Sequence, residues 1–173
     1  MSKLMFMYIY IICLFGFSTF ANGQNNLTTR QIEIKNIAKM VGKSICAQNM
    51  CFSRTLQAIA WQESSFGNNI IGDRGRSLGP FQIKMSTAKR VIKKLNLKEY
   101  YYLLEDKKEL KMRLLLDVYF SAVIAGNYLK MNYEYAIKID HWNPWILTVS
   151  RYNGGNFNRN YLNKITNKIK RLT

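Results

Sequence analysis

Apolar residues recur every three or four positions along most of the chain, and this period constrains the fold more than any other sequence feature. The spacing brings side chains to one face of an α-helix, where they can pack against a core. The helices that it predicts begin near Thr28, Ser53, Ser86, Lys107, Asn143 and Tyr161. The longest, from about Lys107 to Met131, carries small residues that would let a neighbouring helix approach closely: Ala122, Ala125 and Gly126. The pattern predicts a mainly α fold.

Several predicted helix ends carry residues with the chemistry of caps. Thr28 or the threonine after it, and Ser53, can each accept a hydrogen bond from a free N–H group in the first turn. Asn143 is a capping residue, and the proline that follows it suits the first helical position. The Asn-Gly-Gly sequence at residues 153–155 is a stop signal for the same helix.

The helical period is interrupted between Gly67 and Ile83. Glycines, Pro80 and polar residues there predict a loop or a short hairpin. Neither a repeat nor a proline-rich linker divides the rest of the chain. We therefore expect one mainly α domain, with a small irregular or β-like insert after the helix that carries Glu63.

The first residues have the three parts of a secretory signal peptide. Lys3 gives a positive start, residues 5–17 are almost entirely apolar, and small residues follow at 18–23. The apolar core is shorter than the ~20 residues that a membrane-spanning helix needs. We expect residues 1–23 to be a signal peptide, residues 24–173 to form the domain, and the mature protein to be periplasmic or secreted, with no stable membrane span.

The formal net charge of +16 suits an anionic partner. Nucleic acid, a membrane surface and an acidic cell-wall polymer all fit that description. The basic residues are scattered, without an arginine-rich run, and the export signal argues against nucleic acid. The charge is supporting evidence only, since an AT-rich genome that favours lysine codons would also raise it.

After the predicted signal peptide only two cysteines remain, Cys46 and Cys51. Exported proteins form disulfides in oxidising compartments. The two residues can be joined if the chain turns between them, whereas a helix through both would keep them apart. Their spacing has no metal-binding signature. We expect a disulfide between them.

Glu63 is the residue whose position points most clearly to chemistry. It lies seven residues after Leu56 and three after Ala60, on the apolar face of its helix. Burial of a carboxyl raises its pKa because the charged form loses hydration. A carboxyl that stays protonated near neutral pH can donate a proton to a glycosidic oxygen. The alternative is a glutamate turned outward to solvent at the helix end.

Four short motifs follow one another in a fixed order around this residue. They are Glu63-Ser64-Ser65-Phe66, then Ser77-Leu78-Gly79-Pro80-Phe81-Gln82-Ile83 with Thr87-Ala88, then Ser150-Arg151-Tyr152-Asn153-Gly154-Gly155, and finally Asn160-Tyr161-Leu162. This order resembles the lytic transglycosylase family, which has a lysozyme-like fold. The resemblance covers about residues 57–165. The sequence departs from the family pattern at Pro80-Phe81, where Leu-Met is usual, and Pro80 has no N–H to donate.

The resemblance implies a site and a reaction. Glu63 would be the catalytic acid and base. The substrate-binding residues would be Ser77, Gly79, Gln82, Tyr152 and Asn153. No cofactor is implied. The substrate would be the glycan strands of peptidoglycan, cleaved between N-acetylmuramic acid and N-acetylglucosamine. The sugar's own 6-hydroxyl would attack and leave a 1,6-anhydro end, so one carboxyl would suffice.

Two other functions stay open on the sequence alone. Ordinary glycosidases use two carboxylates, and Asp73, in the insert, is the candidate for a second one. If Asp73 orients a water, the protein would be a hydrolase of goose-type lysozyme character. A non-catalytic, cationic peptidoglycan-binding or assembly protein is the third reading. Small one-domain members of the family often accompany secretion, conjugation or pilus machines, so such a machine is a candidate partner.

Overall fold

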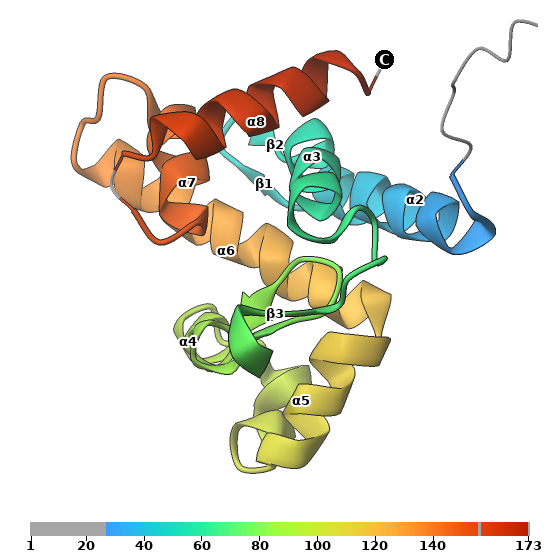
Figure 1. Ribbon diagram of the computed structural model, residues 1–173. Helices are drawn as coiled ribbons and strands as arrows, with labels where there is room; N and C mark the ends of the chain where they lie inside the picture. Colours follow the sequence, from blue (N-terminus) through green and yellow to red (C-terminus); the bar gives the residue numbers. More distant parts are fainter. Residues whose placement is uncertain (1–26, 156, 173) are drawn as a thin grey trace, which may run out of the picture.

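A computed structural model describes residues 27–155 and 157–172. Helix α6 (Val118–Lys138) runs through the middle of the molecule (Figure 1). On one side of it lie α2 (Thr29–Ser44), α3 (Ser53–Ser64), α7 (Pro144–Tyr152) and α8 (Arg159–Lys170). On the other side lie α4 (Met85–Lys94), α5 (Lys107–Leu116) and a small sheet. A 3-10 segment (Lys98–Leu104) joins α4 to α5. The predicted mainly α architecture is confirmed.

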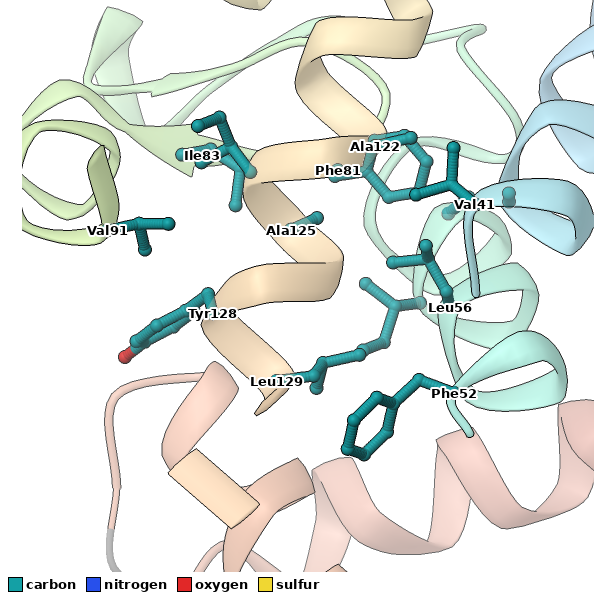
Figure 2. Close-up of a cluster of buried hydrophobic side chains, with 14 of the residues drawn as sticks. Val41, Phe52, Leu56, Phe81, Ile83, Val91, Ala122, Ala125, Tyr128 and Leu129 are labelled. Carbon is teal, nitrogen blue, oxygen red and sulfur yellow. The ribbon is translucent and has the colours of Figure 1, made fainter. Parts of the chain in front are cut away.

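The core of the domain is built around α6. Ala122, Ala125 and Leu129 of this helix meet side chains from both groups of elements (Figure 2). Phe52 and Leu56 come from the α3 side, whereas Phe81 comes from the loop between β4 and β5, Ile83 from β5 and Val91 from α4. At Gly126, an added Cβ would lie 2.8 Å from Ile45 Cδ1. The small residues of α6 therefore do let neighbouring elements approach closely, as the sequence predicts.

The insert after α3 is a three-stranded antiparallel sheet of two-residue strands. Strand β3 (Ile71–Gly72) pairs with β4 (Ser77–Leu78), and β4 pairs with β5 (Ile83–Lys84). A short 3-10 turn (Asp73–Gly75) connects the first two strands. The predicted β-like insert is thus present, and it places residues 69–84 directly beside the end of α3.

The cysteines lie in a second, smaller pair of strands between α2 and α3. Strand β1 (Cys46–Ala47) pairs with β2 (Met50–Cys51), with Cys46 opposite Cys51. This turn brings their Cα atoms to 4.1 Å, and the structure joins the two residues in a disulfide. The bridge closes the connection that leads into the Glu63 helix.

The prediction of a single long helix from Lys107 to Met131 is wrong. The chain bends by 96° between α5 and α6. Asp117 lies at the break in an extended conformation, and its Oδ1 accepts a hydrogen bond from Phe120 N at 2.9 Å. Arg113 also pairs with the Asp117 carboxylate. An aspartate that caps the second helix this way stops the first one, although the apolar period continues across it.

Two of the predicted helix caps are present and one is absent. Thr28 caps α2, and Gln31 Oε1 accepts a hydrogen bond from the Thr28 N–H. Asn143 caps α7 ahead of Pro144, as predicted. Ser53 does not cap α3: it is the first helical residue, and its hydroxyl donates instead to Lys39 O at 3.1 Å. That bond ties the start of α3 to α2.

The expected signal peptide, residues 1–23, lies outside the described residues. Within the described part of the chain, no single helix has the length and hydropathy to span a membrane. Helices α5 and α6 pass that test only as a pair, across their 96° bend.

Candidate active site

Glu63 lies in the last turn of α3, where the chain reverses sharply toward the sheet. Ser65, Phe66 and Gly67 after it all have positive φ angles, of 51°, 56° and 88°. Ser64 stabilises this turn: its Oγ donates to Pro80 O at 2.7 Å and accepts from Gly67 N at 2.7 Å. The helix end that carries Glu63 is thereby bonded to the loop between β4 and β5.

The Glu63 carboxyl is partly buried and has one hydrogen-bond partner among the described residues. The hydroxyl of Tyr161, on α8, donates to Glu63 Oε1 at 2.5 Å. Burial raises the pKa of Glu63, and the Tyr161 hydrogen bond opposes part of that rise because it stabilises the carboxylate. Burial therefore favours a protonated carboxyl, as the apolar position of Glu63 predicts.

A cleft of about 500 Å³ opens in front of this carboxyl. Its walls come from the end of α3, the sheet, α4, α6 and the end of α7. The lining residues are Glu63, Asn69, Gly72, Asp73, Ser77, Gln82, Ile83, Lys84, Thr87, Tyr128, Tyr152, Asn153 and Gly154. Three of the four motifs, although far apart in the sequence, thus line one depression beside α6.

Tyr152 and Gln82 line the cleft, and their side chains donate hydrogen bonds to backbone carbonyl groups. The Tyr152 hydroxyl donates to Phe81 O at 2.9 Å. Gln82 Nε2 donates to Gly79 O at 2.9 Å and to Asn69 O at 3.2 Å. With Ser64, these side chains bind the carbonyl groups of residues 79–81. The loop is therefore well bonded although Pro80 has no N–H.

Tyr152 and Tyr161 both stay protonated near neutral pH. Burial, followed by the nearby charge of Glu63, raises the pKa of each hydroxyl well above its usual value. Tyr161 is 6% exposed. The neutral Tyr161 hydroxyl therefore donates to Glu63, and the neutral Tyr152 hydroxyl donates to Phe81 O.

Gly79 does not line the cleft, in contrast to the role expected for it. Its φ is +74°, and an added Cβ would lie 1.9 Å from Leu114 O. The residue lets the β4–β5 loop pack against the end of α5, since any side chain would collide with that helix. Its part in the site is structural.

Asp73 lines the cleft, but two cationic side chains bind its carboxylate. Arg76 donates to Oδ1 at 2.7 Å, and Lys84 Nζ lies 3.6 Å from Oδ2. The Arg76 hydrogen bond, together with the charges of Arg76 and Lys84, lowers the pKa of Asp73. Such a carboxylate is a poor proton acceptor.

The remaining expected residues lie where the motifs predict. Ser77 is 9% exposed on β4 and lines the cleft. Asn153 lines it from the end of α7, and its Oδ1 accepts a hydrogen bond from Asn158 Nδ2 at 2.9 Å.

Among the described residues, no three His, Cys, Asp or Glu side chains gather in a way that could hold a metal ion.

Tyr161 is the functional residue missing from the site expected from the sequence. It is 98 residues from Glu63, so no local pattern relates the two. The only signal is the Asn-Tyr-Leu motif at residues 160–162, which ends the order of motifs described above.

The comparisons with known proteins agree with this geometry. A family model described as "Transglycosylase SLT domain" matches residues 42–172, which include every lining residue of the cleft. Comparisons with curated proteins and with solved structures found no match.

Proposed function

This chain belongs to the transglycosylase SLT family of lytic transglycosylases, and on that premise we propose that it is an active enzyme in which Glu63 alone supplies the acid and the base. The family membership implies peptidoglycan as the substrate and a lysozyme-like fold. The observation that carries the proposal is the partly buried Glu63 carboxyl, hydrogen-bonded to Tyr161 at one wall of the cleft.

In the first step, protonated Glu63 gives its proton to the oxygen between N-acetylmuramic acid and N-acetylglucosamine. The C–O bond breaks, its electron pair stays on the leaving oxygen, and positive charge develops on the muramic acid ring. Burial supports this role because it raises the pKa of the carboxyl and so favours its protonated form. Since Tyr161 holds Oε1, we assign the transferred proton to Oε2.

In the second step, the Glu63 carboxylate takes the proton of the muramic acid 6-hydroxyl. That oxygen bonds to the sugar's anomeric carbon and closes a 1,6-anhydro ring, which returns Glu63 to its protonated form. The Tyr161 hydrogen bond supports this half of the cycle, since it stabilises the carboxylate between the two steps. No water is consumed.

The contacts of Asp73 favour this reaction over hydrolysis. A hydrolase would use Asp73 to orient or deprotonate a water. Arg76 and Lys84 already bind its two oxygens, and the lowered pKa makes it a weak base. The buried acid at Glu63 likewise disfavours a purely structural, non-catalytic role, because a binding protein gains nothing from it.

The proposal includes export. A signal peptide at residues 1–23 and the resulting periplasmic or secreted location give the enzyme access to its substrate. Amino-terminal sequencing of the mature protein tests cleavage near residue 23. A secretion, conjugation or pilus machine that must cross the wall is the partner we propose for it.

Digestion of purified sacculi tests the activity. Wild-type protein should release soluble fragments, and Glu63→Gln should release them more slowly by about 10²-fold or more, because the amide has no proton to give. Glu134→Gln is the matched control, since Glu134 is exposed and pairs only with Lys130 among the described residues. A Glu63→Gln variant within a few-fold of wild type would overturn the proposal.

A further inference from the structure

One wall of the cleft comes from a strongly basic part of the chain. Residues 74–98, which form β4, β5 and α4, contain eight lysines and arginines and no aspartate or glutamate. Ser77, Gln82, Lys84 and Thr87 from this segment line the cleft. One wall of the site is therefore part of a strongly basic surface.

Two of these cations stand along the cleft side of α4. Thr87 lines the cleft, and Arg90 and Lys94 follow it by three and seven residues, the spacing of one helix face. The Arg90 guanidinium lies 5.3 Å from the ring centre of Tyr128, which lines the cleft from α6. Lys89, by contrast, points to the other side of α4 and donates to Leu104 O. We refer to Arg90 and Lys94 as the α4 rim.

The charge of the α4 rim is not neutralised within the described protein. Arg90 and Lys94 are both exposed, and neither takes part in an ion pair among the described residues. The nearby acid, Asp73, is bound by Arg76 and Lys84. The cation–π contact with Tyr128 holds Arg90 at the cleft without removing its charge.

We infer that the α4 rim binds the carboxylates of the peptide stem that is attached to N-acetylmuramic acid. This inference rests on the proposed function. The glycan backbone consists of hydroxyl, ether and N-acetyl groups, which are neutral and give cations no partner. A peptide stem projects away from the glycan and carries carboxylates. The rim is exposed and continues the helix face of Thr87, which lines the cleft. The preferred substrate is therefore glycan that still bears charged stems.

The test pairs a change in the protein with a change in the substrate. The rim variant is Arg90→Gln with Lys94→Gln. The control variant, Lys164→Gln with Lys170→Gln, removes the same charge from exposed positions on α8 that do not line the cleft. Sacculi are used either native or with the stem carboxylates converted to amides by carbodiimide and ammonia. The initial rate of fragment release is measured at low and high salt.

On native sacculi at low salt, the rim variant should be about fivefold slower than the control variant, the size expected for two exposed charge pairs. High salt should shrink this difference. On amidated sacculi the two variants should have equal rates. An equal loss on both substrates would overturn the inference, since the residues would then act on the glycan or on Tyr128. Equal rates on native sacculi would overturn it as well.

Binding separates this inference from the proposed function. If wild-type protein releases nothing from either substrate, the proposed activity is wrong, and co-sedimentation with sacculi still tests the α4 rim. The rim variant should then bind native sacculi about fivefold more weakly than the control variant, and amidated sacculi equally well. Equal binding to native sacculi would exclude a carboxylate site at the α4 rim.

Discussion

The hydroxyl of Tyr161 lies 2.5 Å from Oε1 of Glu63 and donates a hydrogen bond to it. The bond joins the C-terminal helix α8 to the end of α3. It places a neutral donor against a buried acid, and the two influences on Glu63 are opposed: burial raises its pKa, and the bond lowers it. A residue that must both give and take a proton in one cycle benefits from that balance.

Tyr161→Phe should move the alkaline limit of activity to higher pH. The hydrogen bond lowers the pKa of Glu63, so its removal raises that pKa further, and the protonated acid persists to higher pH. The maximal rate should fall by about tenfold, because a bond to the carboxylate between the two steps is lost. A pH–rate profile measures both effects, with the exposed Tyr119→Phe as control. An unchanged or lower alkaline limit would contradict the assigned role of Tyr161.

Glu63→Gln should make the protein more stable at neutral pH. A raised carboxyl pKa means that the native state binds the proton more tightly than the unfolded chain, so stability is lost as pH rises from the unfolded value of 4.5 through the native pKa. Glutamine avoids that loss and can still accept from Tyr161. The stability gain should be small at about pH 3, where both states are protonated, and should grow with pH until it levels off. Urea unfolding across this range measures it. A variant less stable than wild type at pH 7 would count against a buried Glu63.

Gly79→Ala should destabilise the protein by about 3 kcal/mol, because the new Cβ combines a collision with a left-handed backbone. The Cβ would lie 1.9 Å from Leu114 O. Gly75→Ala is the matched control: its φ is +83°, but an added Cβ meets nothing within 4 Å. It should lose only about 1 kcal/mol. Equal losses in urea unfolding would show that Gly79 has no packing role.

The disulfide should be present in the exported protein. Thiol labelling of the unreduced, denatured mature chain should find no free thiol, because Cys46 and Cys51 are its only cysteines. Replacing both with serine should lower the free energy of unfolding by about 2 kcal/mol, as expected for a loop closed across a sequence separation of 5. Two labelled thiols would mean that the bridge does not form.

The sequence predicts best the features that depend on local pattern. The apolar period locates the helices, and the position of Glu63 on an apolar face explains its burial. The glycines and Pro80 locate the insert. The resemblance to lytic transglycosylases, carried by the ordered motifs, is confirmed by the family match. Each of these inferences needs only residues that are close in sequence, or a known order of motifs.

Features that depend on contacts between distant segments are missed. The break at Asp117 is not predicted because the apolar period continues through it. The hydrogen bond from Phe120 N to the Asp117 side chain sets where α6 begins. Gly79 looks like a substrate contact, and only the approach of Leu114 reveals its packing role. Tyr152 lines the cleft as expected, but the sequence does not predict that its hydroxyl donates to Phe81 O. The contact between Tyr161 and Glu63 needs the whole fold.

The variant Asp73→Asn tests whether the reaction is lytic or hydrolytic by a change in the protein. If Arg76 and Lys84 hold Asp73 only as part of the sheet turn, the variant should keep its activity within a few-fold of wild type. A hydrolase that used Asp73 as its base would lose most of its activity, as the amide cannot accept a proton. The rate of fragment release from sacculi measures the difference, with Glu33→Gln on α2 as the exposed control.

The mass of the muramic acid ends released from sacculi tests the central claim most directly. If Glu63 acts alone and the 6-hydroxyl attacks, the wild-type products end in 1,6-anhydro rings. Those ends are lighter by one water than the reducing ends of a hydrolase, and mass spectrometry distinguishes them without any variant. We expect anhydro ends throughout. Reducing ends from the wild-type enzyme, together with an inactive Asp73→Asn, would contradict it and establish a lysozyme instead.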